Sequence, residues 1–446
     1  MGIISASLCF LLIAYYSLRN SNRVKSQDEY LLAGRHTKLL PLVATLVMTE
    51  FNTGTLISFS SLGYLAGYWA LAMPFIFLIG LLFYTLTVAK KWKQFNGVSV
   101  AHFFATRYGR KLELLVASVL FLAMLGFSAA YIKSLTLLMQ PLIPINSLIL
   151  SAALVIVILL LTLRGGLSSI IALDVLSFIF VILFFPLLVY FSYHLPQSNQ
   201  VPAFNLAQMQ ALLPPKFIIS LTILTMFSYI IAPWYGQKIV AAKTQQTAYF
   251  AAAIAAIIIF LLYGLGILAT AILRSKGVQL ADIQLGLPYL IRNALPHALQ
   301  SVAYLVLFFI AASTLAGVWN AMVTLVVGSI FKSNSSKVST NILWVLICAL
   351  IAYIIANTLI DNILSKMILF NIPIVAFCFA LLAGFYWSKA NSQGAYVSIL
   401  VGITWGIFCY FYFGETGNYT WYWAIYGIPL IFISGISASL FCAKKS

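Results

Sequence analysis

Thr49-Glu50-Phe51-Asn52-Thr53-Gly54-Thr55 places a carboxylate, an amide and a glycine inside an apolar run that extends from residue 39 to residue 61. About 20 apolar residues span the hydrocarbon core of a bilayer as a helix, so this run is long enough to cross a membrane. A charge at that depth costs at least ~2.5 kcal/mol, and Glu50 is therefore expected to serve an ion or proton pathway. The polar stretch predicts a membrane helix broken in its middle, where freed backbone carbonyls line a site.

Similar apolar runs recur along the whole chain. Of its 446 residues, 63% are hydrophobic and 7% are charged, whereas a soluble domain has about 25% charged residues. So few charges cannot cover a water-facing surface, and the sequence predicts an all-α integral membrane protein. About thirteen transmembrane helices are expected, at residues 2–18, 39–61, 69–89, 112–140, 147–163, 167–193, 217–237, 246–273, 298–331, 340–357, 363–386, 395–413 and 422–442.

The formal net charge of +17 comes from short basic clusters between the apolar runs. Basic loops resist translocation, so these clusters mark the cytoplasmic side. An outside N-terminus puts nearly all of them, including Lys238, in the cytoplasm together with the C-terminus. We therefore expect a multi-pass protein of the plasma (inner) membrane, surrounded by lipid and without a nucleic-acid partner. The run at 2–18 lacks a basic leader and is expected to be retained as a helix.

The seventh run, residues 217–237, is interrupted in a matching way. It contains Ser228-Tyr229 and then Ala232-Pro233-Trp234-Tyr235-Gly236, in which the proline cannot donate a helical hydrogen bond. The second and the seventh run each lead a block of five runs. Broken helices at equivalent places in two halves are typical of inverted-repeat transporters. Ordinary kinks are the alternative, because glycine and proline are common in membrane helices.

Other polar residues also lie within apolar runs. Asp174, the second carboxylate at such a depth, is expected on the cytoplasmic side of an ion pathway. Lys133 is open to three interpretations: an ion pair with a carboxylate, a side chain that reaches the outer interface, or a solute-binding group. Ser313 and Thr314 place two hydroxyls side by side, which suits helix packing or a small hard cation, because such ions prefer oxygen ligands.

The motifs of other functional classes are absent from the sequence. It contains no nucleotide-binding loop and no zinc-protease or serine-hydrolase motif. The stretches between apolar runs are too short for a soluble catalytic domain. The four histidines are isolated and the five cysteines lack paired spacing, so a transition-metal site is not expected. We therefore expect a protein that is not an enzyme.

Five segments in order resemble the sodium:solute symporter family, which includes the bacterial sodium/proline and sodium/galactose symporters. Their order, spacing and cytoplasmic placement make the resemblance specific, and it extends from about Asp28 to Lys337. The segments are Tyr30-Leu31-Leu32-Ala33-Gly34-Arg35, the stretch from Thr49 to Thr55 with Gly63-Tyr64 and Gly67 after it, Phe104-Ala105-Thr106-Arg107-Tyr108-Gly109, Arg164-Gly165-Gly166-Leu167 followed by Asp174, and Gln237-Lys238-Ile239-Val240-Ala241-Ala242-Lys243, which is similar to the family pattern QR.laAk.

The resemblance implies a LeuT-type fold, in which two five-helix repeats are related by inverted topology. One extra helix would precede the repeats and two would follow them. The implied divisions are 1–26 for the N-terminal extra helix, 27–193 for the first repeat, 194–216 for an outer loop, 217–386 for the second repeat and 387–446 for the two C-terminal extra helices.

The resemblance also implies a sodium site and a solute site. In the family, sodium is bound by carbonyls at the break of the first core helix and by carbonyl and hydroxyl oxygens of the eighth. Glu50 matches a position important for coupling, and Asp174 matches a carboxylate on the sodium exit route. The residues that match the sodium ligands are Met48, Phe51, Ile310, Ser313 and Thr314, and those expected at the solute are Thr53, Thr55, Ser228, Trp234 and Lys133.

The expected function is sodium-coupled symport, in which Na⁺ is the coupling ion and a small organic solute is imported by alternating access. No obligate protein partner is inferred. Two alternatives stay open. A proton-coupled transporter would use Glu50 as the proton carrier, and a solute sensor of the same fold would need a separate signalling partner.

Overall fold

The computed structural model describes residues 26–95, 97–163, 165–197, 205–331, 338–415 and 417–442. Within these ranges the chain is helical, with an isolated β-bridge and no strand. Seven of the described helices are long and apolar enough to cross a membrane, or up to ten when each bent pair forms one span. The expected thirteen spans are not all found by this measure, because α5 and α9 are short and the run at 2–18 lies outside the described residues.

The helices follow the apolar runs closely, and short helices fill several loops. In the first half of the chain they are α2 (Gln27–Leu32), α3 (Leu39–Glu50), α4 (Thr53–Ala66), α5 (Phe75–Thr87), α6 (Ala89–Gln94), α7 (His102–Tyr108), α8 (Arg110–Met139), α9 (Ser147–Thr162) and α10 (Gly166–Tyr193). In the second half they are α11 (Leu206–Leu212), α12 (Pro215–Tyr229), α13 (Pro233–Val240), α14 (Gln245–Ser275), α15 (Gly286–Asn293), α16 (His297–Leu325), α17 (Val338–Thr358), α18 (Ile363–Val375), α19 (Cys378–Tyr386), α20 (Ser392–Phe413), α21 (Tyr419–Tyr422) and α22 (Ile428–Cys442).

The predicted break of the second run is confirmed between α3 and α4, which meet at a bend of 61°. The Asn52 side chain caps α4 by accepting a 2.8 Å hydrogen bond from the Thr55 amide, as a short polar side chain does at a helix start. The Tyr263 side chain of α14 forms hydrogen bonds with the backbone groups that the break leaves unpaired. Its hydroxyl donates to the Glu50 carbonyl at 2.5 Å and accepts from the Asn52 amide at 3.2 Å. The break is therefore held by a side chain from the other half of the chain.

The predicted break of the seventh run is confirmed as well. α12 ends at Tyr229, and α13 begins at Pro233, which occupies the first helical turn where its missing N–H costs nothing. The Ile230 carbonyl between the two helices accepts a 2.8 Å hydrogen bond from the Trp92 indole. Both broken runs thus have their freed backbone groups bonded to side chains from distant helices.

A third bend was not expected. The run at 363–386 was predicted as one span without mention of a bend, and the structure divides it into α18 and α19, which meet at 40°. Pro373 lies in the last turn of α18 and cannot donate a backbone hydrogen bond there. The chain bends within three residues of this proline, which gives the physical reason for the correction.

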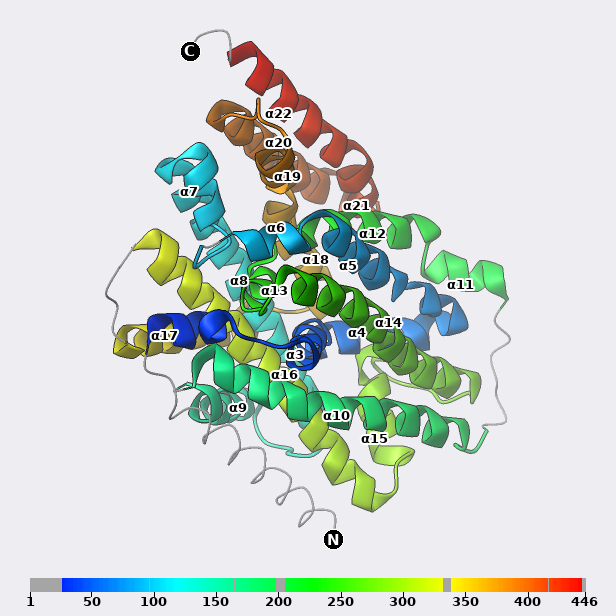
Figure 1. Ribbon diagram of the computed structural model, residues 1–446. Helices are drawn as coiled ribbons and strands as arrows, with labels where there is room; N and C mark the ends of the chain where they lie inside the picture. Colours follow the sequence, from blue (N-terminus) through cyan, green and yellow to red (C-terminus); the bar gives the residue numbers. More distant parts are fainter. Residues whose placement is uncertain are drawn as a thin grey trace.

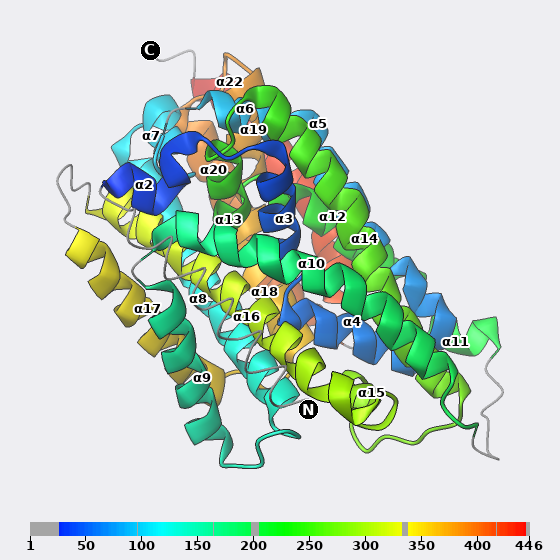
Figure 2. The same cartoon turned by 60° about the horizontal axis from the view of Figure 1, so that its bottom comes forward.

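The two broken runs lie together in the middle of the molecule. Figures 1 and 2 show α3 beside α13 and α10, with α16 behind them and α14 along their outer side. α9 packs on α17 at one edge, and α20 packs on α22 away from it (Figure 1). The segment before α3 is also joined to the segment after α13, because Thr37 donates to the Ala241 carbonyl at 3.0 Å and accepts from the Lys243 amide at 2.8 Å.

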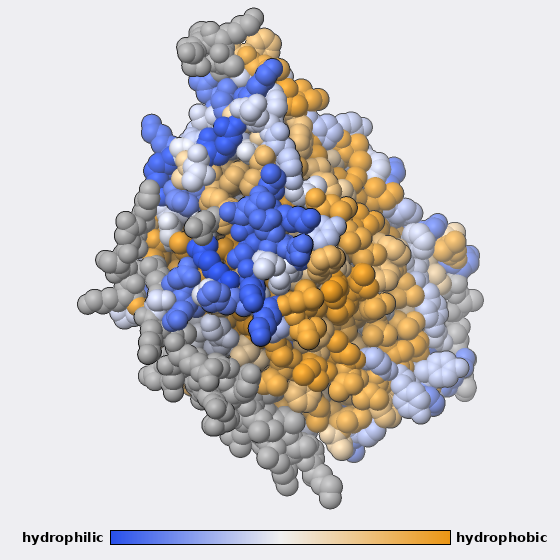
Figure 3. Space-filling view, in the orientation of Figure 1, coloured by the Kyte–Doolittle hydropathy of each residue, from blue (hydrophilic) through white to orange (hydrophobic). Residues whose placement is uncertain are grey.

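The surface fits a membrane environment. Figure 3 shows a broad hydrophobic area over α10 and α14, bordered by hydrophilic residues. Both helices expose large apolar side chains, among them Leu183 of α10 and Leu261 of α14, which are 62% and 54% exposed. An exposed area of this kind marks contact with lipid or protein.

Candidate functional site

The expected sodium ligands from α3 and α16 meet in the core. The Thr314 hydroxyl lies 3.0 Å from the Met48 carbonyl and 2.9 Å from the Ile310 carbonyl. The Ser313 hydroxyl lies 3.1 Å from the Ile310 carbonyl. Positions 310, 313 and 314 share one face of α16 because they are three and four residues apart. Two stretches that are 266 residues apart in sequence therefore place four oxygen atoms in one buried region.

Phe51, the fifth expected ligand, stands where α3 ends. Its backbone has left the helical conformation, with φ −76° and ψ 74°, which turns the carbonyl out of the regular hydrogen-bond pattern of the helix. The ring is fully buried and packs against Phe185 and Tyr263 with ring centres 5.0 and 4.8 Å away. Carbonyl and hydroxyl oxygens of this kind suit a small hard cation.

Glu50 connects the two broken runs. One carboxylate oxygen accepts a 3.0 Å hydrogen bond from the Trp234 indole at the start of α13, and the other accepts from the Tyr229 hydroxyl at the end of α12. The carboxylate is 2% exposed. Its two donors flank the second break, so this side chain links the two breaks directly.

Asp174 of α10 forms an ion pair with Lys238 of α13, with 2.9 Å between Oδ2 and Nζ. Lys238 was predicted as a basic residue of a cytoplasmic loop, but it lies within α13 and its side chain is 1% exposed. The ammonium also donates to the Thr45 carbonyl at 3.1 Å and to the Thr49 hydroxyl, and the Thr45 hydroxyl donates to the same aspartate oxygen. These oxygens compensate the positive charge of the Lys238 ammonium, which would be unfavourable in a buried place without such partners.

The expected solute-site residues are only partly brought together. The Thr53 hydroxyl lies 2.8 Å from the Ser134 hydroxyl of α8, and Phe127 of α8 packs on Trp234 at 5.3 Å between ring centres. These contacts join the first break, α8 and the second break. The other three residues, Thr55, Ser228 and Lys133, lie on α4, α12 and α8.

Those three residues differ in burial and in bonding. Thr55 and Ser228 are buried, but the Ser228 hydroxyl donates within its own helix, to the Thr225 carbonyl at 3.3 Å. Lys133 alone among the five expected residues is not buried. The alternative that Lys133 pairs with a buried carboxylate does not hold for Asp174, which is paired with Lys238.

Sequence reasoning missed several residues of the site: Thr45, Thr49, Tyr229, Lys238 and Tyr263. Thr45 and Thr49 are four residues apart and therefore share the face of α3 that carries Met48. A polar face along an apolar helix was the signal that could have found them. Tyr229 and Tyr263 gave no such signal, because tyrosine is common in membrane helices and only the fold brings these hydroxyls to the break.

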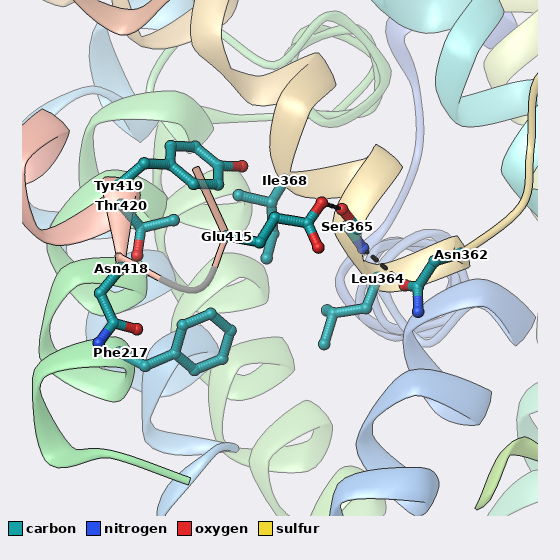
Figure 4. A pocket seen from close by; sticks show the side chains of 9 residues that line it. All are labelled: Phe217, Asn362, Leu364, Ser365, Ile368, Glu415, Asn418, Tyr419 and Thr420. Carbon is teal, nitrogen blue, oxygen red and sulfur yellow. Dashed lines mark hydrogen bonds between the residues drawn. The ribbon is translucent and has the colours of Figure 1, made fainter. Parts of the chain in front are cut away.

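A separate cavity of about 180 Å³ lies where α12 and α18 begin and the segment between α20 and α21 passes over them. Figure 4 shows that Glu415 and Ser365 face each other across it, with a hydrogen bond from the serine hydroxyl to the carboxylate. Phe217, Ile368 and Tyr419 supply apolar walls. None of the expected ion or solute residues lines this cavity.

Comparison with solved structures places the fold among transporters. A Na⁺-coupled sialic acid symporter, solved in a substrate-bound outward-open state, superposes with a TM-score of 0.82 at 14% identity, over 99% of this chain and 97% of the other. MhsT in complex with L-phenylalanine gives 0.59 at 13% identity over 90% and 99%. A manganese transporter of Eremococcus coleocola gives 0.51 at 14% identity over 94% and 96%. The architecture is thus a LeuT-like fold.

Comparison at the level of sequence gives two results. No curated protein sequence matches this chain. The model of the sodium:solute symporter family matches residues 30–402, which include both broken runs and the oxygen-lined region between α3 and α16. The resemblance drawn from the five segments is confirmed, and the chain belongs to the sodium:solute symporter family.

Proposed function

We propose that this protein is a sodium-coupled symporter of the plasma membrane that imports a small organic solute by alternating access. The observation that carries the proposal is the approach of Thr314 to Met48, at 3.0 Å across the interface between α3 and α16. A cation held by oxygens of both helices stabilises their contact, and its loss weakens that contact. Binding that differs between two conformations is what coupling requires, because equal binding to both states shifts nothing.

Sodium that enters the cell supplies the driving force. One charge that crosses 100 mV contributes about 2.3 kcal/mol, to which the concentration gradient adds. The proposed ligands are the carbonyls of Met48, Phe51 and Ile310 and the hydroxyls of Ser313 and Thr314. The proposal keeps the expected orientation, with the N-terminus outside and the C-terminus in the cytoplasm, and the expected inverted repeats at 27–193 and 217–386.

Solute coupling is proposed to run through Glu50. Its carboxylate joins the first break to Tyr229 and Trp234 at the second, and Trp234 also packs on Phe127 of α8. A solute bound between the breaks would contact these groups directly. Thr53, Thr55, Ser228 and Trp234 remain the proposed lining, and Lys133 is the weakest member of the set because it is partly exposed.

The test is uptake into proteoliposomes. The purified protein is reconstituted, a sodium gradient is imposed, and radiolabelled solutes are screened one by one. Sialic acids and aromatic amino acids come first, because one similar structure is that of a Na⁺-coupled sialic acid symporter and another is that of MhsT in complex with L-phenylalanine. Uptake that requires the inward sodium gradient supports the proposal. Uptake that is identical when potassium replaces sodium at constant pH contradicts it.

Proton coupling is the second candidate, favoured by the buried carboxylate of Glu50. It predicts uptake driven by an inward proton gradient in sodium-free medium, and loss of that uptake in Glu50→Gln. Sodium coupling predicts no accumulation under that proton gradient. Measurement of both gradients on the same proteoliposomes separates the two candidates.

A further inference from the structure

Lys238 places an ammonium group beside the proposed sodium site. An ammonium group has three donors, and the structure gives it three oxygen partners: Asp174 Oδ2 at 2.9 Å, the Thr45 carbonyl at 3.1 Å and the Thr49 hydroxyl. The side chain is among the largest fully buried side chains of the described residues. It is therefore held as a bound cation is held, with its charge surrounded by oxygens and shielded from water.

The position of this ammonium is set by the same two helices that form the proposed sodium site. Thr45 and Thr49 lie on α3 on either side of Met48. Across from them on α16, a methyl group built on Gly317 would lie 3.7 Å from Nζ. Gly317 follows Ser313 by four residues, which is one helical turn. The two cation positions are thus neighbours along the interface between α3 and α16.

Asp174 stands between these two positions. Its Oδ2 bonds to Lys238, while Oδ1 has no hydrogen-bond partner among the described residues. The Ser313 side chain lies close to the same carboxylate. Without the lysine, two aspartate oxygens, the Thr45 carbonyl and the Thr49 hydroxyl would surround an empty place. Such a set of oxygens suits a monovalent cation as well as an ammonium group.

The charges of this region also oppose a second sodium ion. Lys238 and Asp174 form a buried ion pair, so the ammonium group already compensates the charge of this aspartate. A buried region with uncompensated charge is unfavourable, so a second sodium ion would be opposed by the lysine already present.

We propose that the Lys238 ammonium occupies the position of a second coupling cation and thereby limits the transporter to one sodium ion per cycle. The inference rests on the proposed sodium coupling. Lys238→Met removes the charge, and its side chain ends one atom short of the ammonium position, which leaves the oxygen set of Asp174, Thr45 and Thr49 to sodium. The double change Lys238→Met with Asp174→Asn removes both charges and closes that position again.

The experiment counts sodium ions bound per protein by equilibrium binding of radioactive sodium to purified protein in detergent, and measures the Hill coefficient of uptake against sodium concentration. The wild type is expected to bind one ion with a Hill coefficient near one. Lys238→Met is expected to bind two ions and to show a Hill coefficient above one. The double variant is expected to return to one ion.

Two results overturn the inference: a wild type that binds two sodium ions, or a folded Lys238→Met that still binds one. If Lys238→Met does not fold, the variant with Ser313→Ala and Thr314→Ala decides, because it leaves the lysine in place. At the lowest sodium concentration that saturates the wild type, this variant binds little sodium if the wild type has one site, and it keeps one ion if the wild type has two. A wild type that binds no sodium at all contradicts the proposed function itself, which separates the two failures.

Discussion

The hydroxyl of Thr314 on α16 donates a 3.0 Å hydrogen bond to the carbonyl of Met48 on α3. The carbonyl lies in the last turn of a helix that stops at Glu50, and the hydroxyl lies in the middle of a helix that continues unbroken to Leu325. A continuous helix and a broken helix thus meet at one pair of oxygen atoms. A cation bound there adds to this contact.

Removal of the two hydroxyls should weaken sodium binding. In Ser313→Ala with Thr314→Ala, the sodium concentration for half-maximal uptake is expected to rise at least about tenfold, since an interaction with a charged group contributes about 1.5–3 kcal/mol. Sodium titration of uptake in proteoliposomes measures the change. Thr324→Ala is the matched control, because its hydroxyl is buried on the same helix and bonds within that helix to Ala321. An unchanged sodium requirement in the double variant would contradict the site.

Trp234→Phe should affect the solute more than the ion. It removes the donor that lies 3.0 Å from the Glu50 carboxylate, and an unsatisfied buried acceptor costs about 1–3 kcal/mol. We expect solute uptake to fall about tenfold while sodium binding is retained. Trp405→Phe is the control, because its indole bonds to the Tyr422 carbonyl among the C-terminal helices. A change in sodium requirement with normal solute affinity would place Trp234 at the ion instead.

Lys238→Met should destabilise the fold when sodium is absent. The removal of one partner of a buried ion pair costs about 3–5 kcal/mol, because Asp174 keeps a charge without its partner. Thermal unfolding in detergent should therefore show a lower Tm, and added Asp174→Asn should restore much of it. Lys366→Met serves as the control: its partner Asp361 is 76% exposed, and exposed pairs contribute about 0–1 kcal/mol. Equal Tm losses in the two single variants would argue against a special role of the buried pair.

Gly166→Ala should prevent close packing at the start of α10. Gly166 has φ +53°, and a Cβ built there lies 2.3 Å from the Tyr30 carbonyl oxygen, so the backbone of α2 or α10 must move. A strained backbone alone costs about 1–3 kcal/mol, and we expect a reduced yield of folded protein and a lower Tm. Gly264→Ala, with nothing within 4 Å of its Cβ, should behave like the wild type. Normal stability of Gly166→Ala would show that the approach of the two segments is looser than described.

Much of the fold could be predicted from local physics. Glu50, Asn52 and Gly54 interrupt an apolar run, and the break follows at that place since a helix in lipid tolerates such residues only at a site. Pro233 likewise marks the second break. The bend after Pro373 was missed, because a single proline in an otherwise apolar run is compatible with both a straight and a bent helix until its neighbours are known.

The site was less predictable than the fold. Met48 and Thr314 were paired through a resemblance to a family, and no local pattern brings residues so distant in sequence together. Lys238 was misplaced for a physical reason: a lysine close to the end of an apolar run is normally a cytoplasmic charge. Its burial depends on Asp174, which lies on another helix. A hydropathy profile reports only local composition and therefore does not indicate an ion pair between distant segments.

The link between Thr37 and the segment after α13 has a mechanical consequence. Two backbone hydrogen bonds join residue 37 to Ala241 and Lys243, so the leading half of one interrupted helix is tied to the trailing half of the other. A conformational change that swings α3 alone must break both bonds, whereas a rotation that carries α3 and α13 together preserves them. A conformational change in which α3 and α13 tilt together as one rigid body therefore costs less free energy than a movement of α3 alone, because it keeps both backbone hydrogen bonds of Thr37.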